Sequence, residues 1–598
     1  MIQRNISLSL FCLIVFAGKI FTQDLPVGYT MQEKSMMKDY YFSHSKSTTA
    51  VTPPLSSLRT PGEWEEIQAL TITWTSYTSV LREIVRYATQ ECIVYINCTD
   101  SSSVKSYLQL GSVSLANVRY IIAPNNSVWI RDYGAQTVYT NEVDSVLLID
   151  WTYNRPRPKD DTIPRSLARI TGLPLYELNQ QPWKIVATGG NFMADGLGTA
   201  FSSKLILEEN ASGGGYNQNL TESDVDTIYR KFMGVTRYIK MNTLPYDGIH
   251  HIDMHMKLLD EETLLIGQYP SGTADGPQIE ANIQYVLSNF TSAFGKPYRI
   301  IRIPMPPDNT SGNTYPDNGG DYLTFTNGVF VNKTFLYPTY YTQYDTIAQR
   351  IYEQALPGYQ VVGINCSQTI PASGAIHCIT NSVGSSDPLL IVHQPIRDSL
   401  LPQNEFQTEI KAYIKHRTGI QSAQLHYKIF FGNMMWDSVV SQMSPVTNES
   451  GYWSGLITYP MLIKTVADTI RIEYFISATS VSGKTQVRPI TAPLGSWKYS
   501  KLHSMSKVEE MSQNVFLDKV YPNPANAITC IPVNSNCKTV AKIILYDISG
   551  RAVKKIFEGT LNNGCQNFFF DATSLAKGVY TLLLKTERNI SIQKVMVK

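Results

Sequence analysis

The stretch "HIDMHMKLLDEETLLIGQY" (251–269), followed closely by "IEANIQYVLSNFTSAFG" (279–295), puts a β-rich run directly ahead of a helical one. The first part is rich in apolar residues and turns at a polar cluster, which is typical of strands joined by a hairpin. The second has apolar residues at the three- and four-residue spacing of a helix. Strands that alternate with helices in this way indicate an α/β domain.

The same alternation extends over residues 57–384. β-rich runs at 121–139 and 328–338 alternate with helical runs at 161–172 and 345–358. We therefore predict one α/β domain over 57–384, and the loose recurrence of its units indicates a weak internal repeat.

Two β-rich regions follow this domain. Short strands separated by turns over 385–495 predict a sandwich of immunoglobulin type that lacks the two cysteines of antibody domains. A polar linker at 496–515 then leads to a second small β domain at 516–598.

The N-terminal sequence predicts export. Arg4 precedes an apolar stretch at 6–17 and then polar residues, the pattern of a secretory signal peptide, which we assign to 1–23. Residues 24–56 are then an N-terminal extension or pro-segment. No other window is apolar and long enough to predict a transmembrane segment.

Charge and cysteine content narrow the functional classes. The net charge is +2 without a long run of one sign, which gives no electrostatic reason to expect nucleic acid as a partner. Of the eight cysteines, Cys12 falls in the signal peptide, and the odd number left leaves at least one thiol unpaired. Cys378 lies in "GAIHCITNSVG" (374–384), which we predict to be a short apolar strand. Three roles are open for it: a disulfide partner of Cys366, a buried residue or a nucleophile.

The histidine-rich "HHIDMHM" (250–256) has three readings. On a strand, His251, Asp253 and His255 share one face. They could hold a metal, although no zinc-ligand spacing occurs elsewhere, or form a hydrogen-bonded structural cluster. The third reading is a catalytic pair of His251 and Asp253. His250 is a rival for His251, but strand alternation places His250 on the face opposite Asp253, so we prefer His251.

The last domain carries four ordered motifs: "VYPNPA" (520–525), "KIILYDISGRAVKKI" (542–556), "LAKGVYTLLL" (575–584) and "KVMVK" (594–598). Together they resemble the C-terminal sorting domain of type IX secretion in Bacteroidetes bacteria. The resemblance implies the type IX secretion machinery as a partner and a protein that is secreted or attached to the outer cell surface. A generic adhesive β sandwich is the alternative.

The α/β region carries five motifs in order: "SVWIRDYG" (127–134), "GGNFMADGLGT" (189–199), His-x-Asp (251–253), Thr-Asn-Gly (326–328) and "IHCIT" (376–380). This series resembles the family of agmatine deiminases and Porphyromonas-type peptidylarginine deiminases. The resemblance implies the guanidine-modifying fold, a five-bladed α/β propeller with pseudo-fivefold symmetry and a site in its central channel.

The chemistry of guanidine hydrolysis calls for these residue types. Two carboxylates, Asp132 and Asp253, can grip a planar guanidinium through charge-assisted bonds. Its carbon is a poor electrophile and needs a thiolate, for which Cys378 is the candidate. His251 can protonate the departing nitrogen and then activate water, so neither a metal nor an organic cofactor is required.

The resemblance adds Asn327 as a residue that lines the site, and Trp129 can cover the guanidinium or its alkyl stem. Each assignment has a plain structural alternative. Asp132 could form a surface ion pair with its neighbour Arg131, Asn327 could be a turn residue, and Trp129 could belong to the core.

Substrate choice rests on "WTYNRPRPKDD" (151–161), where Arg155 and Arg157 could clamp the carboxylate of a peptide's last residue. The peptidylarginine deiminases that the chain resembles have such a pair, whereas a solvated basic loop is the alternative. Together with export, this predicts a secreted hydrolase that converts peptidyl-arginine, preferably C-terminal, to citrulline and ammonia through a thiouronium intermediate. A deiminase of a small free guanidine such as agmatine and a non-catalytic surface adhesin are the alternatives.

Overall fold

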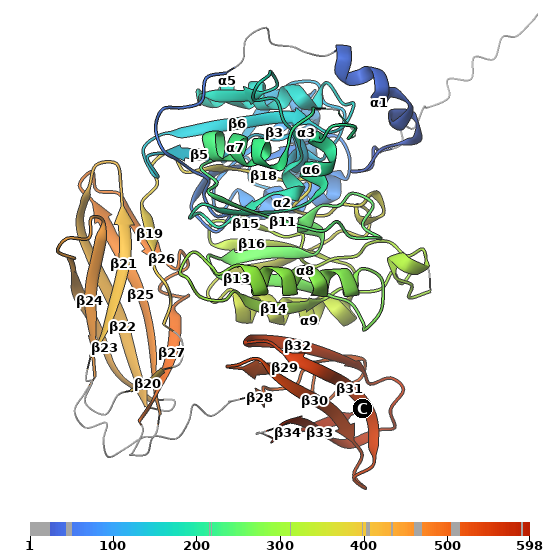
Figure 1. Cartoon of the computed structure of the whole chain (residues 1–598), viewed down its shortest axis with the longest axis vertical. Coiled ribbons are helices and arrows are strands. Elements are labelled where there is room, and N and C mark those ends of the chain that lie inside the picture. Colours follow the sequence, from blue (N-terminus) through green and yellow to red (C-terminus); the bar gives the residue numbers. More distant parts are fainter. Residues whose placement is uncertain are drawn as a thin grey trace, which may run out of the picture.

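The computed structural model describes residues 24–43, 51–214, 216, 218–310, 312–396, 399–401, 407–431, 434–459, 469–503, 515–587 and 590–598. The predicted signal peptide at 1–23, residues 44–50 of the N-terminal extension and residues 504–514 of the predicted linker lie outside them. Figure 1 shows an α/β region, a large β region beside it and a small C-terminal β region below.

In the described residues of the α/β region there are five small sheets, and one unit recurs in them. In the unit predicted at 251–295, β12 (Met256–Asp260) and β13 (Thr263–Gln268) form a hairpin, and α8 (Gly276–Asn289) crosses to β14 (Arg299–Pro304), which runs parallel to β13. A parallel pair requires such a crossover, which explains why each hairpin is followed by a helix.

The other four sheets repeat the antiparallel and parallel pairing. Their elements are β15 (Val329–Val331), β16 (Thr334–Thr339), α9 (Thr342–Ala355) and β17 (Gln360–Asn365); β9 (Met193–Ala194), β10 (Thr199–Ser203), α6 (Leu205–Asn210), α7 (Glu222–Met233) and β11 (Arg237–Met241); β1 (Leu58–Arg59), β5 (Gln136–Thr140), β6 (Val146–Tyr153), α5 (Ile163–Thr171), β7 (Leu175–Leu178) and β8 (Val186–Ala187); and β18 (Asn381–Gly384), β2 (Ile67–Thr73), α2 (Thr78–Ala88), β3 (Ile93–Cys98), α3 (Ser101–Leu110) and β4 (Val118–Ile122).

The last strand of the region, β18, pairs with β2 near its beginning, so this sheet joins the two ends of the α/β region. The helices cover the sheets with apolar faces. In α2, for example, Val80, Leu81, Ile84 and Val85 are buried. Helix α7 begins at a capping box formed by Thr221 and Asp224 and ends at Gly234, whose φ of 68° suits a glycine.

The large β region contains only strands in its described part, in the order β19-β21-β24-β23-β22-β25-β27-β20, with β26 added to β25. Its strands are β19 (Leu390–Val392), β20 (Ser399–Leu401), β21 (Gln407–Lys415), β22 (Ile420–Phe431), β23 (Met434–Pro445), β24 (Tyr452–Thr458), β25 (Thr469–Ser480), β26 (Thr485–Arg488) and β27 (Trp497–His503). Alternate residues of β21, namely Ile410, Ala412 and Ile414, point into its core.

The C-terminal region has two sheets around one core. They contain β28 (Val515–Leu517), β29 (Ile528–Ser535) and β32 (Gly564–Asp571), and β30 (Thr539–Tyr546), β31 (Ala552–Leu561), β33 (Gly578–Thr586) and β34 (Ile590–Val597). This region contacts the α/β region at β14, where the Asn567 side chain donates to the Arg302 carbonyl at 2.8 Å.

Three local predictions were wrong. Residues 250–255 are not a strand, because His250 has a φ of 58° and Ile252–Met254 form a 3-10 turn before β12. Cys378 lies in a turn ahead of β18 and not on a strand, and the β-rich run at 121–139 contains the short helix α4 (Ile130–Tyr133). Buried polar side chains bond to the backbone in these loops, and such bonds compete with regular pairing.

Candidate active site

Cys378 is the centre of a buried polar cluster. Its thiol is fully buried and forms no disulfide, as predicted. The Asn327 amide nitrogen lies 3.2 Å from the sulfur, and the sulfur lies 3.7 Å from Oδ2 of Asp253. The Asn327 side-chain oxygen accepts the backbone N–H groups of His377 and Cys378, so Asn327 fixes the turn and also contacts the sulfur.

Asp253 is held by residues that the sequence analysis missed. Its Oδ2 lies 2.7 Å from Nδ1 of His377, whose Nε2 lies 2.9 Å from Glu63. Glu63 in turn pairs with Lys257 at 2.5 Å. His377 could have been noticed as the neighbour of Cys378, but Glu63 lies 314 positions from it in the sequence, and no local pattern marks that partner.

Asp132 and His251 complete the cluster from other elements. Helix α4 carries Asp132, and the N–H of Arg131 donates to the Cys378 carbonyl at 3.1 Å, which ties α4 to the cysteine turn. Oδ1 of Asp132 lies 3.6 Å from Nδ1 of His251. The structure therefore brings together all five residues predicted to be catalytic, although His251 and Asp253 come from a loop.

Gly190 lies where these groups meet. A Cβ at residue 190 would lie 2.5 Å from Nδ1 of His251, 3.1 Å from Oδ1 of Asp132 and 3.2 Å from Oδ2 of Asp253. The lack of a side chain at this position therefore lets two carboxylates and an imidazole approach the backbone closely. It belongs to the Gly-Gly-Asn of the second sequence motif.

Several buried atoms of the cluster have no hydrogen-bond partner among the described residues. They are both ring nitrogens of His251, Oδ1 of Asp253 and one terminal nitrogen of Arg131. Nearly all buried polar groups in proteins are paired, so such a group of orphans suits a polar ligand. The alternative in which Asp132 and Arg131 form a surface pair does not hold, since both are buried.

Burial and charge set the protonation states. Burial, with the charges of Asp253 and Asp132, raises the pKa of the Cys378 thiol well above its usual value. Burial also lowers the pKa of His251 against the opposing carboxylates. For Asp253, burial acts to raise the pKa, but the hydrogen bond and charge of His377 outweigh it and the pKa lies below the usual value. The resting cluster therefore favours a thiol, a neutral His251 and an ionised Asp253.

The third member of the proposed metal set, His255, is also buried, and burial lowers its pKa to about 4. Its predicted place on one strand face with His251 and Asp253 is lost, because the loop is not a strand. Across the ranges given for the structure, no group of three His, Cys, Asp or Glu side chains is arranged to hold a metal ion.

Trp129, Arg155 and Arg157 are all buried, so the two arginines do not belong to a solvated basic loop. The Trp129 ring nitrogen donates to the Leu25 carbonyl at 2.7 Å. Arg157 pairs with Glu33 at 2.8 Å, so the residues predicted to bind substrate contact the N-terminal segment.

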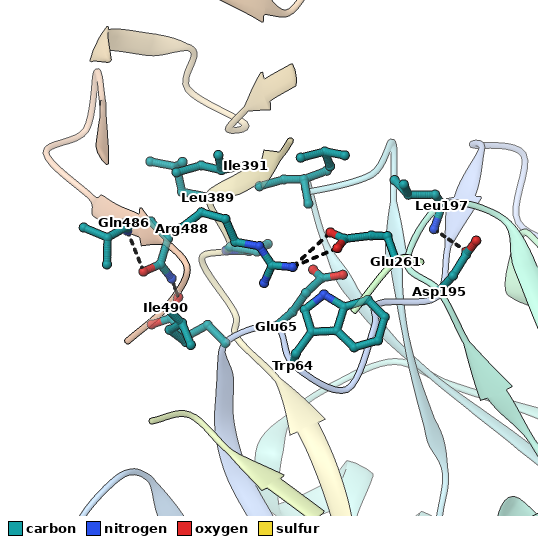
Figure 2. Close-up of a pocket in the computed structure, with 16 residues that line it drawn as sticks. Trp64, Glu65, Asp195, Leu197, Glu261, Leu389, Ile391, Gln486, Arg488 and Ile490 are labelled. Atoms are coloured by element: carbon teal, nitrogen blue, oxygen red, sulfur yellow. Dashed lines mark hydrogen bonds and ion pairs between the residues drawn. The ribbon is translucent and has the colours of Figure 1, made fainter. Parts of the chain in front are cut away.

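A separate pocket lies between the α/β region and the large β region (Figure 2). One guanidinium nitrogen of Arg488 lies 3.0 Å from both carboxylate oxygens of Glu261 across this boundary. Trp64, Glu65 and Leu389 also line the pocket. None of the predicted site residues is among its lining residues.

Comparison with known proteins identifies the family to which the α/β region belongs. The model of the family described as Porphyromonas-type peptidyl-arginine deiminase matches residues 59–383, more than half of the chain. The chain belongs to this family. This deiminase is thus a hydrolase of guanidine C–N bonds.

Among relatives of the deiminase, a protein of Latilactobacillus sakei named as an agmatine deiminase is 23% identical over 56% of this chain and 98% of its own length. One from Marinomonas with the same name is 22% identical over 58% of this chain and 100% of its own length. A solved structure named for an arginine deiminase of Porphyromonas gingivalis is 20% identical, covers 55% of this chain and 99% of that one, and has a TM-score of 0.48. The C. jejuni agmatine deiminase is 18% identical, covers 56% and 99%, and has a TM-score of 0.46.

The C-terminal region of the deiminase, residues 519–598, matches the secretion system C-terminal sorting domain. This domain indicates type IX secretion in Bacteroidetes, so the protein interacts with that machinery and is secreted or attached to the cell surface. No helix in the described ranges is long and apolar enough to span a membrane.

Proposed function

We propose that this deiminase hydrolyses the guanidinium of peptidyl-arginine, preferably at a C-terminus, to citrulline and ammonia. The supporting observation is the convergence of Cys378, Asn327 and Asp253, with Asp253 also meeting Asp132 and His251 beside Gly190. A planar cation that donates hydrogen bonds on its edges would satisfy the orphaned Oδ1 of Asp253 and balance both carboxylates.

The first role in this proposal is that of Cys378 as nucleophile. Burial, together with the two carboxylates, holds the thiol protonated. A bound guanidinium would offset part of the carboxylate charge, so the substrate itself promotes the thiolate. The sulfur attacks the central carbon to form a C–S bond and a tetrahedral adduct. Asn327, through its 3.2 Å contact with the sulfur, keeps the nucleophile in line.

The second role is proton transfer by His251. Neutral in the resting site, it can take up the thiol proton and give it to the departing nitrogen, so that the C–N bond breaks and ammonia leaves. A covalent thiouronium remains. Water that loses a proton to His251 then attacks the same carbon. The C–S bond breaks, the ureido product is released and the thiol is regenerated.

The choice of peptidyl-arginine is supported by Arg155 and Arg157. Both guanidinium groups are buried, and one already holds a carboxylate, that of Glu33. Agmatine has no carboxylate and would leave such a pair unused. A deiminase of free agmatine is the second candidate, because the relatives above carry that name.

The proposal also extends to the architecture. We assign the five sheets of residues 57–384 to the blades of a pseudo-fivefold α/β propeller, with Trp129 covering the substrate at its central site. Residues 385–495 serve as an immunoglobulin-like packing module, whose sheet also includes β27 (Trp497–His503) from the predicted linker at 496–515, and residues 516–598 serve as a small sorting sandwich. Residues 1–23 are the signal peptide and 24–56 an N-terminal pro-segment.

The test compares three substrates: a peptide ending in arginine, the same peptide amidated, and agmatine. We expect citrulline to form fastest from the free-acid peptide, and Cys378→Ala to abolish it. Equal rates for the free-acid and amidated peptides would refute the clamp, and faster turnover of agmatine would establish the second candidate. No ammonia from any of them, with the N-terminal pro-segment present or removed, would favour an adhesin.

A further inference from the structure

The N-terminal segment, residues 24–33, binds along the residues proposed to receive the substrate. The carbonyl of Leu25 accepts from Trp129, and that of Val27 accepts from Nε of Arg155 at 2.9 Å. Arg157 donates to the carbonyls of Pro26 and Gly28 at 2.7 and 3.0 Å, respectively. The segment is therefore held as an extended peptide ligand would be, through its backbone carbonyls.

Glu33 supplies a carboxylate to the same site. Its two oxygens lie 2.8 and 3.2 Å from nitrogens of Arg157. Glu33 also forms a capping interaction with Thr30 at the start of α1 (Met31–Ser43), which fixes the carboxylate in place. The Tyr29 ring lies 4.2 Å from the guanidinium of Arg155, so both arginines already have partners.

The segment also contacts loops that carry the chemistry. Val27 is fully buried, and its N–H donates to the Ala372 carbonyl at 2.9 Å, in the loop that leads to Cys378. A Cβ at Gly28 would lie 3.7 Å from Ile249, two positions before His251. With the segment in place the Cys378 side chain has no solvent exposure, so a peptide cannot reach the sulfur unless a covering element moves.

Apart from Glu33, the first turn of α1 adds little to this attachment. In the part of α1 for which burial is described, Glu33 is buried, whereas Met31, Gln32 and Lys34 are exposed. Figure 1 shows α1 at the edge of the α/β region. The covalent link to the rest of the chain favours binding of residues 24–33, since a tethered ligand has a high effective concentration that is lost on cleavage.

We propose that residues 24–33 form an autoinhibitory plug that occupies the substrate clamp and keeps the deiminase latent until the segment is cleaved from the chain and released. This inference rests on the proposed function, because it identifies the blocked residues as the substrate site. The occupant that replaces the plug is a peptide segment with a free carboxylate, which takes the position of the Glu33 carboxylate on Arg157.

The test uses the full chain with a recognition sequence for a site-specific protease inserted after Ser43. Two quantities are measured before and after cleavage and size-exclusion chromatography. The first is kcat/KM on a peptide ending in arginine. The second is the rate at which iodoacetamide alkylates Cys378, followed by peptide mass spectrometry, which does not depend on any deiminase activity.

We expect cleavage to raise both quantities at least tenfold, and a synthetic peptide of residues 24–43 to inhibit the cleaved enzyme in competition with substrate. In the uncleaved chain, Glu33→Gln should give a partial gain because Arg157 loses its carboxylate. The matched control Lys34→Gln alters an exposed neighbour and should remain latent. Alkylation of buried Cys92 should not change, which excludes general unfolding.

The outcomes separate the two proposals. A rise in alkylation without any deimination would support the plug and overturn the peptidyl-arginine function. Equal deimination and equal alkylation before and after cleavage would overturn the plug and leave the function standing.

Discussion

Gly190→Ala provides a direct steric test of the proposed site. Residue 190 has no positive φ in the structure, so alanine is compatible with the backbone. Its Cβ would lie 2.5 Å from Nδ1 of His251, and ordinary contact begins at 3.4 Å, so the imidazole must retreat by about 0.9 Å. A misplacement of about 1 Å costs about 10²-fold in rate, or about 2.7 kcal/mol of activation free energy.

We therefore expect kcat/KM to fall about 10²-fold on a peptide ending in arginine, measured as citrulline formed with both proteins in the same cleaved form. The control is Gly248→Ala, in the loop that carries His251, where an added Cβ meets nothing within 4 Å. It should retain wild-type activity. A Gly190→Ala enzyme with unchanged melting temperature and activity close to wild type would refute the location of the chemistry.

Three further results are expected. Cys378→Ser should lower kcat at least about 10³-fold with little change in the Kd for substrate, because a hydroxyl is a far weaker nucleophile at neutral pH; calorimetric binding with single-turnover kinetics checks this. Burial, with the charge of Asp275, raises the pKa of Asp247 to about 8, so its contribution to stability is fully present below about pH 4 and is lost as pH rises towards 8. Asp247→Asn should therefore gain stability relative to wild type as pH rises through this window, by about 1.4 kcal/mol per pH unit. A difference in melting that does not vary with pH would contradict the assignment. Between the α/β and large β regions, Glu261→Gln should destabilise the protein by about 2 kcal/mol, and by more than Arg488→Met does. Burial already raises the pKa of Glu261 to about 7, so Glu261 can take up a proton when Arg488 is lost, whereas Arg488 cannot lose its proton when Glu261 is lost. Scanning calorimetry at about pH 7 compares the two variants, and equal losses of stability would contradict the argument.

The sequence determined which kinds of element form and which family the chain belongs to. Apolar spacing predicted the helical runs at 161–172 and 345–358, which the structure confirms as α5 and α9 with shifted ends. Local spacing encodes these elements, because a helix buries one face regardless of what packs against it. The ordered motifs identified the family and the sorting domain, since these signals are local in the chain.

Only the tertiary structure decided how these residues meet. Strand alternation was the wrong basis for choosing His251 over His250, since the loop at 250–255 is irregular and its orientation is set by Asp132 and Gly190 from other elements. Glu63 and its bond to His377 had no sequence signal, because that bond spans more than half of the chain. The contact of Glu33 with Arg157 likewise joins residues 124 positions apart. Pairings at such separations depend on how the sheets pack around the site, and a one-dimensional pattern does not contain that information.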